Sequence, residues 1–508
     1  MMRRWQVSWF VLGAALLAPL TLVDIPPLLD YPNHLARAFV LAFGSRDPIL
    51  AQMYAPHWAI IPNLGIDLVL PPLLYVLPPY VAGRLIIALA IVLPVIGTIA
   101  YSRAVFGTRS LWPLASVLVA YNGTLLLGFL NFDAGLGLAL LLAAAWIVWR
   151  EQYPVRILAL AIAGAVALFF CHLMSLVFCA ILIGGYEAEY VWRRRDAGLV
   201  ATRAATAMLP LIAPLILYAL SPLSPVVDGL EWPTLDNKLR ELVLPFANYL
   251  LPLDIATAGA VVGYLLLCTV RGRCRVTLGS SIALGLVALL FVASPNAVKG
   301  TYLFDTRFIV MLGFLLFGTV LPTAAPRTAA AFFGLLFAAR MIVVGEAWIE
   351  QRQDLAELRA TIAPVQAGAR VFVVLTTPKQ APRYWRDGPM SRILSLGLPL
   401  DYHLPALLLI EHSAFWPYLF DDPSQQPVET LPPYRELAQQ AGGFVSYRAL
   451  TEPHPIDLCG YDDVLLLGAG GVRNLDRLDS ERLELVSQSD VAALFRIRDT
   501  CGTPVAGR

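Results

Sequence analysis

Charged side chains are scarce in this chain. They make up 14% of its 508 residues, whereas 58% are hydrophobic and the mean hydropathy is +0.67. Soluble domains carry about 25% charged residues, so most of this sequence is too apolar for a water-soluble fold. Lysine is nearly missing, because the 37 basic residues include only Lys238, Lys299 and Lys379. The chain has a net charge of +1 and no basic tract, so we do not expect it to bind nucleic acid.

The few charges are unevenly distributed along the chain. Residues 351–508 hold 34 of them, and the 350 residues before that point hold 39. The change falls near Glu350, where an apolar run gives way to QRQDLAELRA. Such a shift in composition indicates a change of solvent. It predicts a transmembrane domain over residues 1–350 and a soluble domain over residues 351–508.

Long apolar runs are the main positive signal, since a spanning helix needs about 20 mostly apolar residues. Eleven stretches qualify: 7–24, 82–102, 110–130, 134–150, 155–171, 174–192, 204–222, 248–270, 278–294, 307–323 and 328–347. A further apolar piece, 63–79, contains paired prolines that kink helices and remove amide donors, so it is either a re-entrant hairpin or a broken span. The predicted fold class is an α-helical polytopic membrane protein with about eleven spans and a small C-terminal α/β extracytoplasmic domain.

Arginine positions predict the orientation, because short arginine-rich loops stay in the cytoplasm. The clusters are Arg3-Arg4, Arg103 with Arg109, Arg150 with Arg156, Arg193 to Arg195, Arg271 with Arg273 and Arg275, and Arg327. All of these clusters fall on one side of the membrane if residues 63–79 do not cross it. The first outer loop, 25–62, and the C-terminal domain then lie on the other side. We therefore expect a bacterial inner-membrane protein with a cytoplasmic N-terminus and a periplasmic or extracellular C-terminal domain.

Cysteine is also rare, with six residues in the whole chain. Four of them lie in or beside predicted spans, and only Cys459 and Cys501 lie in the soluble domain. A disulfide between these two is permitted in an oxidising compartment. Two unpaired thiols are the alternative, because disulfide geometry cannot be read from sequence.

A dense polar cluster follows the first predicted span, in the string DIPPLLDYPNHLAR. Pro32 suits a helix start, and the apolar pattern after it predicts a short amphipathic helix in the membrane interface that stops at Gly44. Asp30 would then lie at the N-terminus of this helix, near His34 and Arg37. Such a carboxylate could act as a general base towards an acceptor hydroxyl. The alternative is a helix cap beside an interfacial histidine.

Further polar residues are predicted on the same outer face. Asp133 lies between two spans, and His172 is flanked by apolar residues. The alternative for His172 is a buried histidine bonded to a carbonyl. Lys299 and Arg307 lie just before a late span, where a cation could hold a phosphate. An ion pair between Arg307 and Asp305, or an interfacial anchor, is the alternative there.

The layout and the string LLDYPNHLAR resemble the glycosyltransferase C superfamily, the membrane enzymes that use polyprenyl-phosphate-linked sugars. The string is similar to first-loop motifs in uncharacterised bacterial members. The resemblance implies that Asp30 is the catalytic base and that Asp133 is a second acid. It also implies that Arg307 or Lys299 contacts the lipid phosphate. The sequence departs from the family in having a single Asp30 rather than an acidic pair, which leaves a divalent cation (Mg²⁺ or Mn²⁺) as an open question.

On this basis the sequence predicts a transferase that moves a sugar from a polyprenyl-phosphate donor to a glycan, lipid or protein acceptor. Asp30 and His34 are the expected catalytic residues, with His34 orienting the carboxylate. The expected substrate-binding residues are Asp133, His172, Lys299, Arg307 and Arg37. A transporter is the first alternative, although the matched pair of interrupted helices that it would need is not visible. A non-catalytic membrane assembly or binding protein is the second.

The sequence of the soluble domain indicates no catalytic chemistry of its own. Residues 370–376, 464–467 and 493–497 read as strands, and 434–440 and part of 403–412 read as helices. Gly468-Ala-Gly-Gly471 lacks the GxGxxG spacing and is expected to be a turn. His403, His412 and His454 lack metal-ligand spacing, so packing or surface roles are expected. Trp385, Trp416, Tyr418 and Gln425-Gln426 would suit a sugar, although ordinary packing explains the aromatic residues equally well.

Overall fold

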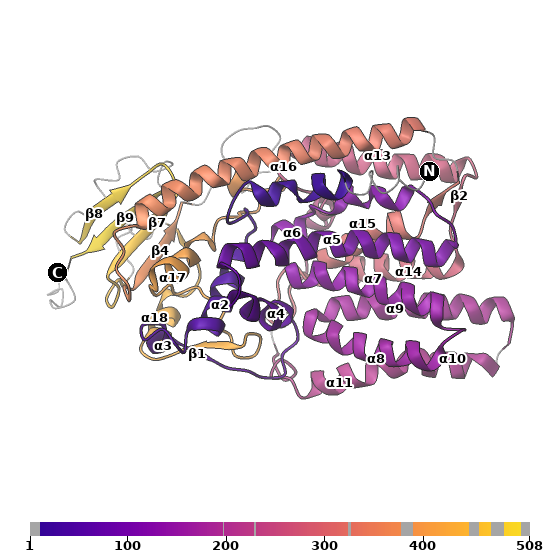
Figure 1. Ribbon diagram of the computed structural model, residues 1–508, viewed down its shortest axis with the longest axis horizontal. Coiled ribbons are helices and arrows are strands. Elements are labelled where there is room, and N and C mark those ends of the chain that lie inside the picture. The colour runs from indigo at the N-terminus through magenta and orange to yellow at the C-terminus, as the bar shows by residue number, and fades with distance from the viewer. Residues whose placement is uncertain are drawn as a thin grey trace.

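The computed structural model describes residues 11–196, 198–227, 230–323, 327–376, 390–446, 457–468 and 482–498. Helices and a sheet occupy opposite ends of its long axis (Figure 1). The short strand β2 (Cys274–Arg275) lies at the helical end, and the strands β8 (Leu483–Gln488) and β9 (Ala492–Ile497) lie at the other. The molecule therefore has a mostly helical part and a small C-terminal sheet region.

Seven helices in the described chain are long and apolar enough to cross a membrane. They are α5 (Pro79–Phe106), α7 (Leu130–Trp149), α8 (Pro154–Cys171), α9 (Leu173–Arg194), the run Gly198–Ala219 formed by α10 (Gly198–Met208) and α11 (Ile212–Ala219), α13 (Leu251–Val270) and α16 (Arg327–Ile362). The other four predicted spans contain shorter apolar helices. These are Val11–Thr21, the run Trp112–Leu126, α14 (Leu278–Ala293) and α15 (Thr306–Gly318).

The proline-rich piece 63–79 forms one short helix, α4 (Gly65–Leu74), followed by a turn into α5. At 1.5 Å per residue, α4 is about 15 Å long, half the thickness of the apolar core of a bilayer. Pro71 and Pro72 lie inside this helix. The length of α4 agrees with the re-entrant or broken alternatives and not with a complete span.

Close backbone contact holds the central helices α5 and α7 together. A Cβ atom on Gly137 would come within 2.3 Å of the backbone carbon of Leu93. One on Gly97 would lie 2.6 Å from the carbonyl oxygen of Gly137. Small residues permit this approach in apolar helix pairs, where van der Waals packing drives association. The contact fixes α7, whose first turn carries Asp133.

One helix joins the two parts of the molecule. α16 runs without interruption from Arg327 to Ile362, along the edge of the helical part and on to the sheet (Figure 1). The predicted domain boundary near Glu350 therefore falls inside a helix. Trp348 and Leu355, on either side of that point, are both buried, so the chain is packed continuously across the boundary.

The described residues of the C-terminal part form a five-stranded sheet in the order β6-β4-β7-β9-β8. The three inner strands β4 (Val371–Leu375), β7 (Asp463–Leu467) and β9 confirm the predicted strands. β4 pairs in parallel with β7 and with β6 (Val445–Ser446), whereas β9 is antiparallel to its neighbours. The helices α17 (Leu407–His412) and α18 (Tyr434–Ala441) agree with the predicted helical segments. Trp385, His454 and residues 469–471 lie outside the described residues.

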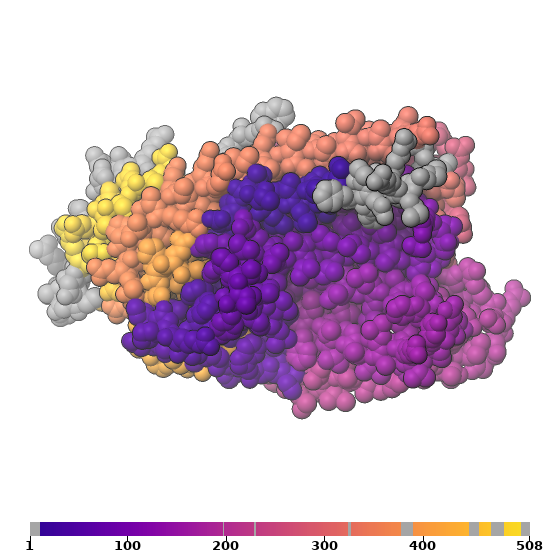
Figure 2. Space-filling view, in the orientation of Figure 1, coloured from indigo at the N-terminus to yellow at the C-terminus, as the bar shows by residue number. Residues whose placement is uncertain are grey.

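The first outer loop packs against the C-terminal part rather than extending freely. Its helix α2 (Tyr31–Phe43) is followed by α3 (Leu50–Met53) and by β1 (Tyr54–Pro56), which pairs antiparallel with β5 (Val428–Thr430). Figure 2 shows the corresponding N-terminal surface lying directly against C-terminal residues. The predicted helix is present and ends before Gly44. However, the helix does not lay an apolar face into lipid, because ten of its thirteen residues are buried within the protein.

Candidate functional site

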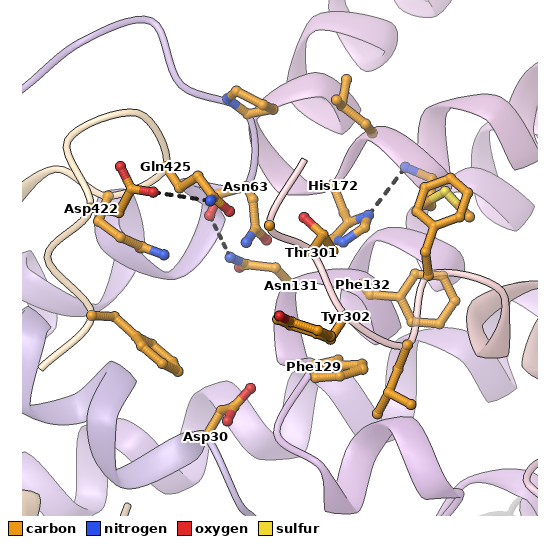
Figure 3. A pocket seen from close by; sticks show the side chains of 18 of the residues that line it. Asp30, Asn63, Phe129, Asn131, Phe132, His172, Thr301, Tyr302, Asp422 and Gln425 are labelled. Carbon is orange, nitrogen blue, oxygen red and sulfur yellow. Dashed lines mark hydrogen bonds between the residues drawn. The ribbon is translucent and has the colours of Figure 1, made fainter. Parts of the chain in front are cut away.

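A cavity of about 700 Å³ lies where the first loop, the ends of the apolar helices and the C-terminal part meet (Figure 3). Its lining comes from residues within 29–34, 62–63, 127–132, 172–174, 298–307 and 419–426, with Tyr218, Leu223 and His403. These segments are far apart in sequence. The cavity thus brings together most of the polar residues predicted for the outer face.

Asp30 lies at the entrance to helix α2 with its side chain on the cavity. Its backbone is fixed, since its N–H donates to the carbonyl of Leu127 at 3.2 Å and its carbonyl accepts from the His34 N–H at 3.0 Å. Although it is the N-cap residue, its side chain makes no capping hydrogen bond within the described chain. The helix-cap alternative is therefore wrong for this carboxylate, which is left available to a ligand.

His403, from the C-terminal part, is the histidine that faces Asp30. Its Nε2 lies 3.4 Å from Oδ1 of Asp30. Its Nδ1 is 2.9 Å from the side-chain nitrogen of Asn33. That nitrogen also donates to the carbonyl of Tyr418 at 2.8 Å, and the amide oxygen of Asn33 accepts from the Phe420 N–H at 2.9 Å. Because Asn33 donates to Nδ1, the neutral ring carries its hydrogen on Nε2, towards Asp30.

Burial sets the protonation of this pair. It raises the pKa of Asp30 to about 7, and the positive charges of Arg307 and Arg37 partly offset the effect. Burial also lowers the pKa of His403 to about 3, so the ring is neutral near pH 7. A carboxylate with a pKa close to the working pH is suited to general base catalysis. The neutral imidazole of His403 can donate a hydrogen bond to the carboxylate of Asp30 without adding a second charge to the site.

His34 lines the cavity but does not orient Asp30 as predicted. Its ring stacks edge-on to Phe420, with the centroids 5.6 Å apart. Its Nδ1 is buried with no hydrogen-bond partner among the described residues, and burial lowers its pKa well below the ordinary value. The orienting role assigned to His34 therefore passes to His403, which the sequence indicated only as a packing or surface residue.

Arg307 supplies a cation in the cavity wall. The residue is 5% exposed, and its Nη1 donates to the carbonyls of Tyr302 and Leu303 at 3.1 and 2.7 Å. The guanidinium carbon lies 4.4 Å from the centre of the Phe129 ring, and Nε has no partner among the described residues. Arginine with unused donors in a buried wall is a good ligand for a phosphate or carboxylate. Its predicted alternative partner, Asp305, instead bonds Lys238.

Lys299 also lines the cavity, but its ammonium group is already occupied. It donates to the carbonyls of Leu223, Ser224 and Val226 at 3.3, 2.8 and 2.6 Å. An ammonium group has three hydrogens to donate, so these contacts use its full capacity. Lys299 holds the 223–226 turn in place, and Arg307 is the better candidate for an anion.

His172 lines the cavity and begins helix α9. Its Nδ1 accepts a hydrogen bond from the Met174 N–H at 3.1 Å, so it caps the helix rather than bonding a carbonyl. Its ring packs edge-on to Phe132, with the centroids 5.5 Å apart. Because Nδ1 is used as an acceptor, a neutral ring presents an Nε2–H donor.

Two predicted binding residues lie outside the cavity lining. Arg37 makes a two-pronged ion pair with Asp67 at 2.7 and 2.8 Å, and both side chains are 0% exposed. Asp133 accepts from the Thr124 hydroxyl at 3.0 Å and from the Asn122 amide at 3.4 Å. Both predicted roles are corrected, because neither side chain lines the cavity and each is bonded to other residues inside the protein, although Nη1 of Arg37 has no partner among the described residues. Arg37 and Asp133 support the wall instead of contacting a ligand.

The C-terminal part contributes more to the cavity than the sequence indicated. Asp422 and Gln425 lie on one side, near Asn63 and Asn131, whereas the aromatic rings of Phe129, Phe132 and Tyr302 lie on the other (Figure 3). Gln426 also lines the cavity, as the sugar-binding interpretation predicted for that pair. Trp416 and Tyr418 are outside this lining and buried, at 0% and 8% exposed. The cavity therefore has one polar side and one aromatic side.

The described residues contain no group of three or more His, Cys, Asp or Glu side chains placed to hold a metal ion. The soluble-domain cysteine Cys459 is disulfide-bonded, and Cys501 lies outside the described residues.

Comparisons of the chain with protein-family models, with curated proteins and with solved structures found no match. The function must therefore be argued from the cavity itself.

Proposed function

We propose that the chain is a membrane glycosyltransferase that moves a sugar from a polyprenyl-phosphate donor to an acceptor hydroxyl at the outer face. The observation that carries this proposal is the position of Asp30. Its carboxylate makes no helix-capping hydrogen bond, faces a cavity of about 700 Å³ and lies 3.4 Å from the neutral ring of His403. The same cavity contains an arginine with an unpaired nitrogen. A base and an anion-binding cation in one cavity are what sugar transfer from a phosphate requires.

In the proposed reaction Asp30 accepts the proton of the acceptor hydroxyl. The hydroxyl oxygen forms a bond to the anomeric carbon as the bond from that carbon to the phosphate oxygen breaks. The polyprenyl phosphate leaves with the bonding electrons, and the proton remains on Asp30. Arg307 stabilises the negative charge that develops on the leaving phosphate, because a preorganised cation contributes most where charge appears in the transition state. Attack from the opposite side inverts the anomeric configuration.

His403 and Asn33 hold the base in place. The N–H of His403 donates towards Asp30, and Asn33 fixes the ring by donating to its other nitrogen. The distance of 3.4 Å is longer than an ordinary hydrogen bond, and such contacts tighten when substrate binds. His403 is thus a positioning residue, and it couples the C-terminal part to the chemistry.

The membrane setting belongs to the same proposal. Seven long apolar helices are compatible with a multi-pass inner-membrane protein, with lipid as a permanent partner. The short arginine-rich β2 connection lies at the end of the molecule away from the sheet (Figure 1). This placement supports a cytoplasmic N-terminus and a periplasmic or extracellular C-terminal part. The disulfide of Cys459 supports the same orientation, because disulfides persist in oxidising compartments.

The test is turnover of a panel of radiolabelled polyprenyl-phosphate sugars by membranes that contain matched amounts of protein. We expect Asp30→Asn to reduce transfer by about 10²- to 10⁴-fold, the usual contribution of a general base. Asp24→Asn is the matched control. Asp24 lies just before the first outer loop and outside the cavity lining, and its side chain is 49% exposed. The proposal is wrong if Asp30→Asn equals wild type, or if wild type consumes no donor in the panel.

A further inference from the structure

A second cavity, of about 630 Å³, lies within the C-terminal part. Its lining comes from residues 417–423, Glu429, Thr430, Arg435, Ala438, Gln439, 442–444 and His403. His403, Phe420 and Asp422 are among the residues that line both this cavity and the one containing Asp30. The two cavities therefore share a wall, and the histidine that faces the proposed base is part of it.

Aromatic rings form much of the second cavity. The rings of Tyr418 and Phe444 lie 4.7 Å apart and are tilted by 39°. Phe444 also packs edge-on to His403, at 5.1 Å. Tyr418 is 8% exposed, and its hydroxyl has no hydrogen-bond partner among the described residues. Aromatic faces pack well on the CH-rich faces of sugar rings, and a buried tyrosine hydroxyl usually has a partner. A ligand hydroxyl would provide that partner.

The charges of this cavity favour a neutral ligand over an anionic one. Arg435 is paired with Glu429 at 2.9 Å. Asp421 accepts a hydrogen bond from the Thr430 hydroxyl, and Asp422 accepts from Ser424 at 2.8 and 2.9 Å. The two aspartates have no basic partner among the contacts of the described residues. Carboxylate oxygens accept hydrogen bonds from sugar hydroxyls and repel phosphate or uronate groups.

An exposed edge connects the two cavities. Asp422 is exposed and contributes to both linings, and the exposed Pro423 follows it on the side of the second cavity. A ligand longer than one sugar unit could occupy the second cavity and cross this edge towards Asp30. The donor, in contrast, would meet the first cavity where the apolar helices end. The two reactants would then approach from different sides.

We propose that the second cavity is the acceptor subsite, where the C-terminal part binds the remote sugar units of an uncharged glycan. This inference rests on the proposed transferase function, because it assigns the acceptor of that reaction. It selects a glycan from the glycan, lipid and protein acceptors that the sequence left open. The terminal hydroxyl of the glycan reaches Asp30 while the remaining units pack on Tyr418 and Phe444.

The experiment blocks the cavity without straining the backbone. Gly443 lines it, and a Cβ atom at this position would meet nothing within 4 Å. Gly443→Trp therefore places an indole ring at the lining of the cavity without a clash at its Cβ atom. Gln440→Trp is the matched control, since Gln440 is an exposed residue of α18 outside the lining. Full-length protein in nanodiscs is titrated with fluorescent neutral oligosaccharides built from glucose, mannose, galactose or N-acetylglucosamine, and with oligogalacturonate as the anionic probe.

We expect at least one neutral oligosaccharide to bind wild type, with oligogalacturonate at least about tenfold weaker. Gly443→Trp should weaken the neutral ligand by at least about tenfold, and Gln440→Trp should bind as wild type does. The inference is overturned if no neutral oligosaccharide binds wild type. Equal binding by the two tryptophan variants, or equal binding of the anionic probe, also overturns it.

A separate readout distinguishes this inference from the transferase proposal. Asp30→Asn should lose transfer yet bind the neutral oligosaccharide as wild type does, since Asp30 lies outside the second cavity. Normal binding with normal transfer in Asp30→Asn rejects the assigned base and leaves the subsite standing. Loss of transfer without any oligosaccharide binding rejects the subsite and leaves the base standing.

Discussion

Asp30 owes its proposed chemistry to neighbours from distant parts of the chain. The carboxylate belongs to the first loop, the imidazole that faces it belongs to residue 403, and the cation in the same cavity belongs to residue 307. Burial is the largest influence on its pKa, which rises to about 7. The residues that bury Asp30 therefore set the pH at which this proposed base ionises.

The first residue-scale prediction concerns pH. Only ionised Asp30 can accept a proton, so kcat/KM for sugar transfer should rise with pH and level off above about 7, the pKa of Asp30. Arg307 lowers that pKa. Arg307→Gln should therefore move the rise to higher pH, besides reducing the plateau through weaker stabilisation of the leaving phosphate. Rates measured across the pH range in membranes test this, and a rise at unchanged pH in Arg307→Gln would contradict it.

The second residue-scale prediction concerns His403. Its N–H favours ionised Asp30 and fixes its direction, so His403→Ala should lower kcat by about 10- to 100-fold, the cost of a misplaced reacting group. KM should change less than kcat, and the rise in the pH profile should move to higher pH because a donor to the carboxylate is lost. His403→Gln, which keeps a donor, should recover part of the rate.

The control for that experiment is His412→Ala. His412 contacts the carbonyl of Val365 and lies outside both cavities. If His403→Ala and His412→Ala lowered the rate equally without a shift in pH profile, His403 would have only a structural role.

Sequence reasoning located Asp30 and Arg307 but not His403. Both of the former precede an apolar run, so their approximate depth follows from hydropathy. Nothing local marks His403, because its partner Asn33 is 370 residues away. Arg37 and Asp133 were misassigned for a related reason. A polar residue at membrane depth can serve a ligand or another buried side chain, and only the structure shows Asp67, Thr124 and Asn122 as their partners.

At the scale of elements, α2 positions the base and is itself fixed by one buried ion pair. Arg37 of α2 bonds Asp67 of α4 through two nitrogens, with both side chains fully buried. Removal of one partner leaves an uncompensated charge in the interior. Such a change typically costs about 3–5 kcal/mol, whereas replacement of both partners by apolar residues is often neutral.

We therefore predict that Arg37→Met lowers the free energy of unfolding by about 3–5 kcal/mol. The double variant Arg37→Met with Asp67→Leu should recover most of the loss. Chemical unfolding of the purified protein in detergent measures both. Equal stability of Arg37→Met and wild type would show that the pair does not hold α2 in place.

Hydropathy predicted the long helices better than the interrupted ones. The predicted span 134–150 corresponds closely to α7. The predicted span 110–130 is divided into a 3-10 segment (Trp112–Val119) and α6 (Gly123–Leu126). Asn122 causes the break, because its side chain accepts from the N–H groups of Thr124 and Leu125 and starts a new helix. An apolar window averages over such a cap, so its effect is not visible in hydropathy.

At the scale of the whole molecule, the proposed orientation has a direct test. Glu436 of α18 and Arg194 at the end of α9 are both exposed. We expect a membrane-impermeant maleimide to label Glu436→Cys in intact cells, and Arg194→Cys only after permeabilisation. The four other described cysteines that are free are Cys171, Cys179, Cys268 and Cys274, of which three are buried. A variant without these four gives the background, and labelling of Arg194→Cys in intact cells would reverse the proposed topology.

The sequence predicts a helical part and a C-terminal sheet part, but it does not predict how the first loop packs against the C-terminal part. Composition predicts an apolar part and a soluble part because each must match its solvent. It contains no information on the pairing of β1 with β5, which joins residues 54–56 to residues 428–430. That pairing depends on backbone hydrogen bonds, which most side chains permit, and β1 even contains a proline, Pro56, which argues against a strand in the sequence. The cavity is lined by both the first loop and the C-terminal part, which explains why the contribution of His403 was not predicted.

In the proposed membrane setting, the continuity of α16 would make the rate of sugar transfer sensitive to the thickness of the bilayer. A helix of 36 residues is about 54 Å long at 1.5 Å per residue. A tilt of roughly 5° about its centre would displace each end by about 2 Å. Apolar helices adjust their tilt to bilayer thickness, so thinner or thicker bilayers should move the sheet relative to the cavity. We therefore expect the rate of sugar transfer in nanodiscs to pass through a maximum as acyl chain length increases. Only one bilayer thickness would hold the sheet in its best position relative to the cavity.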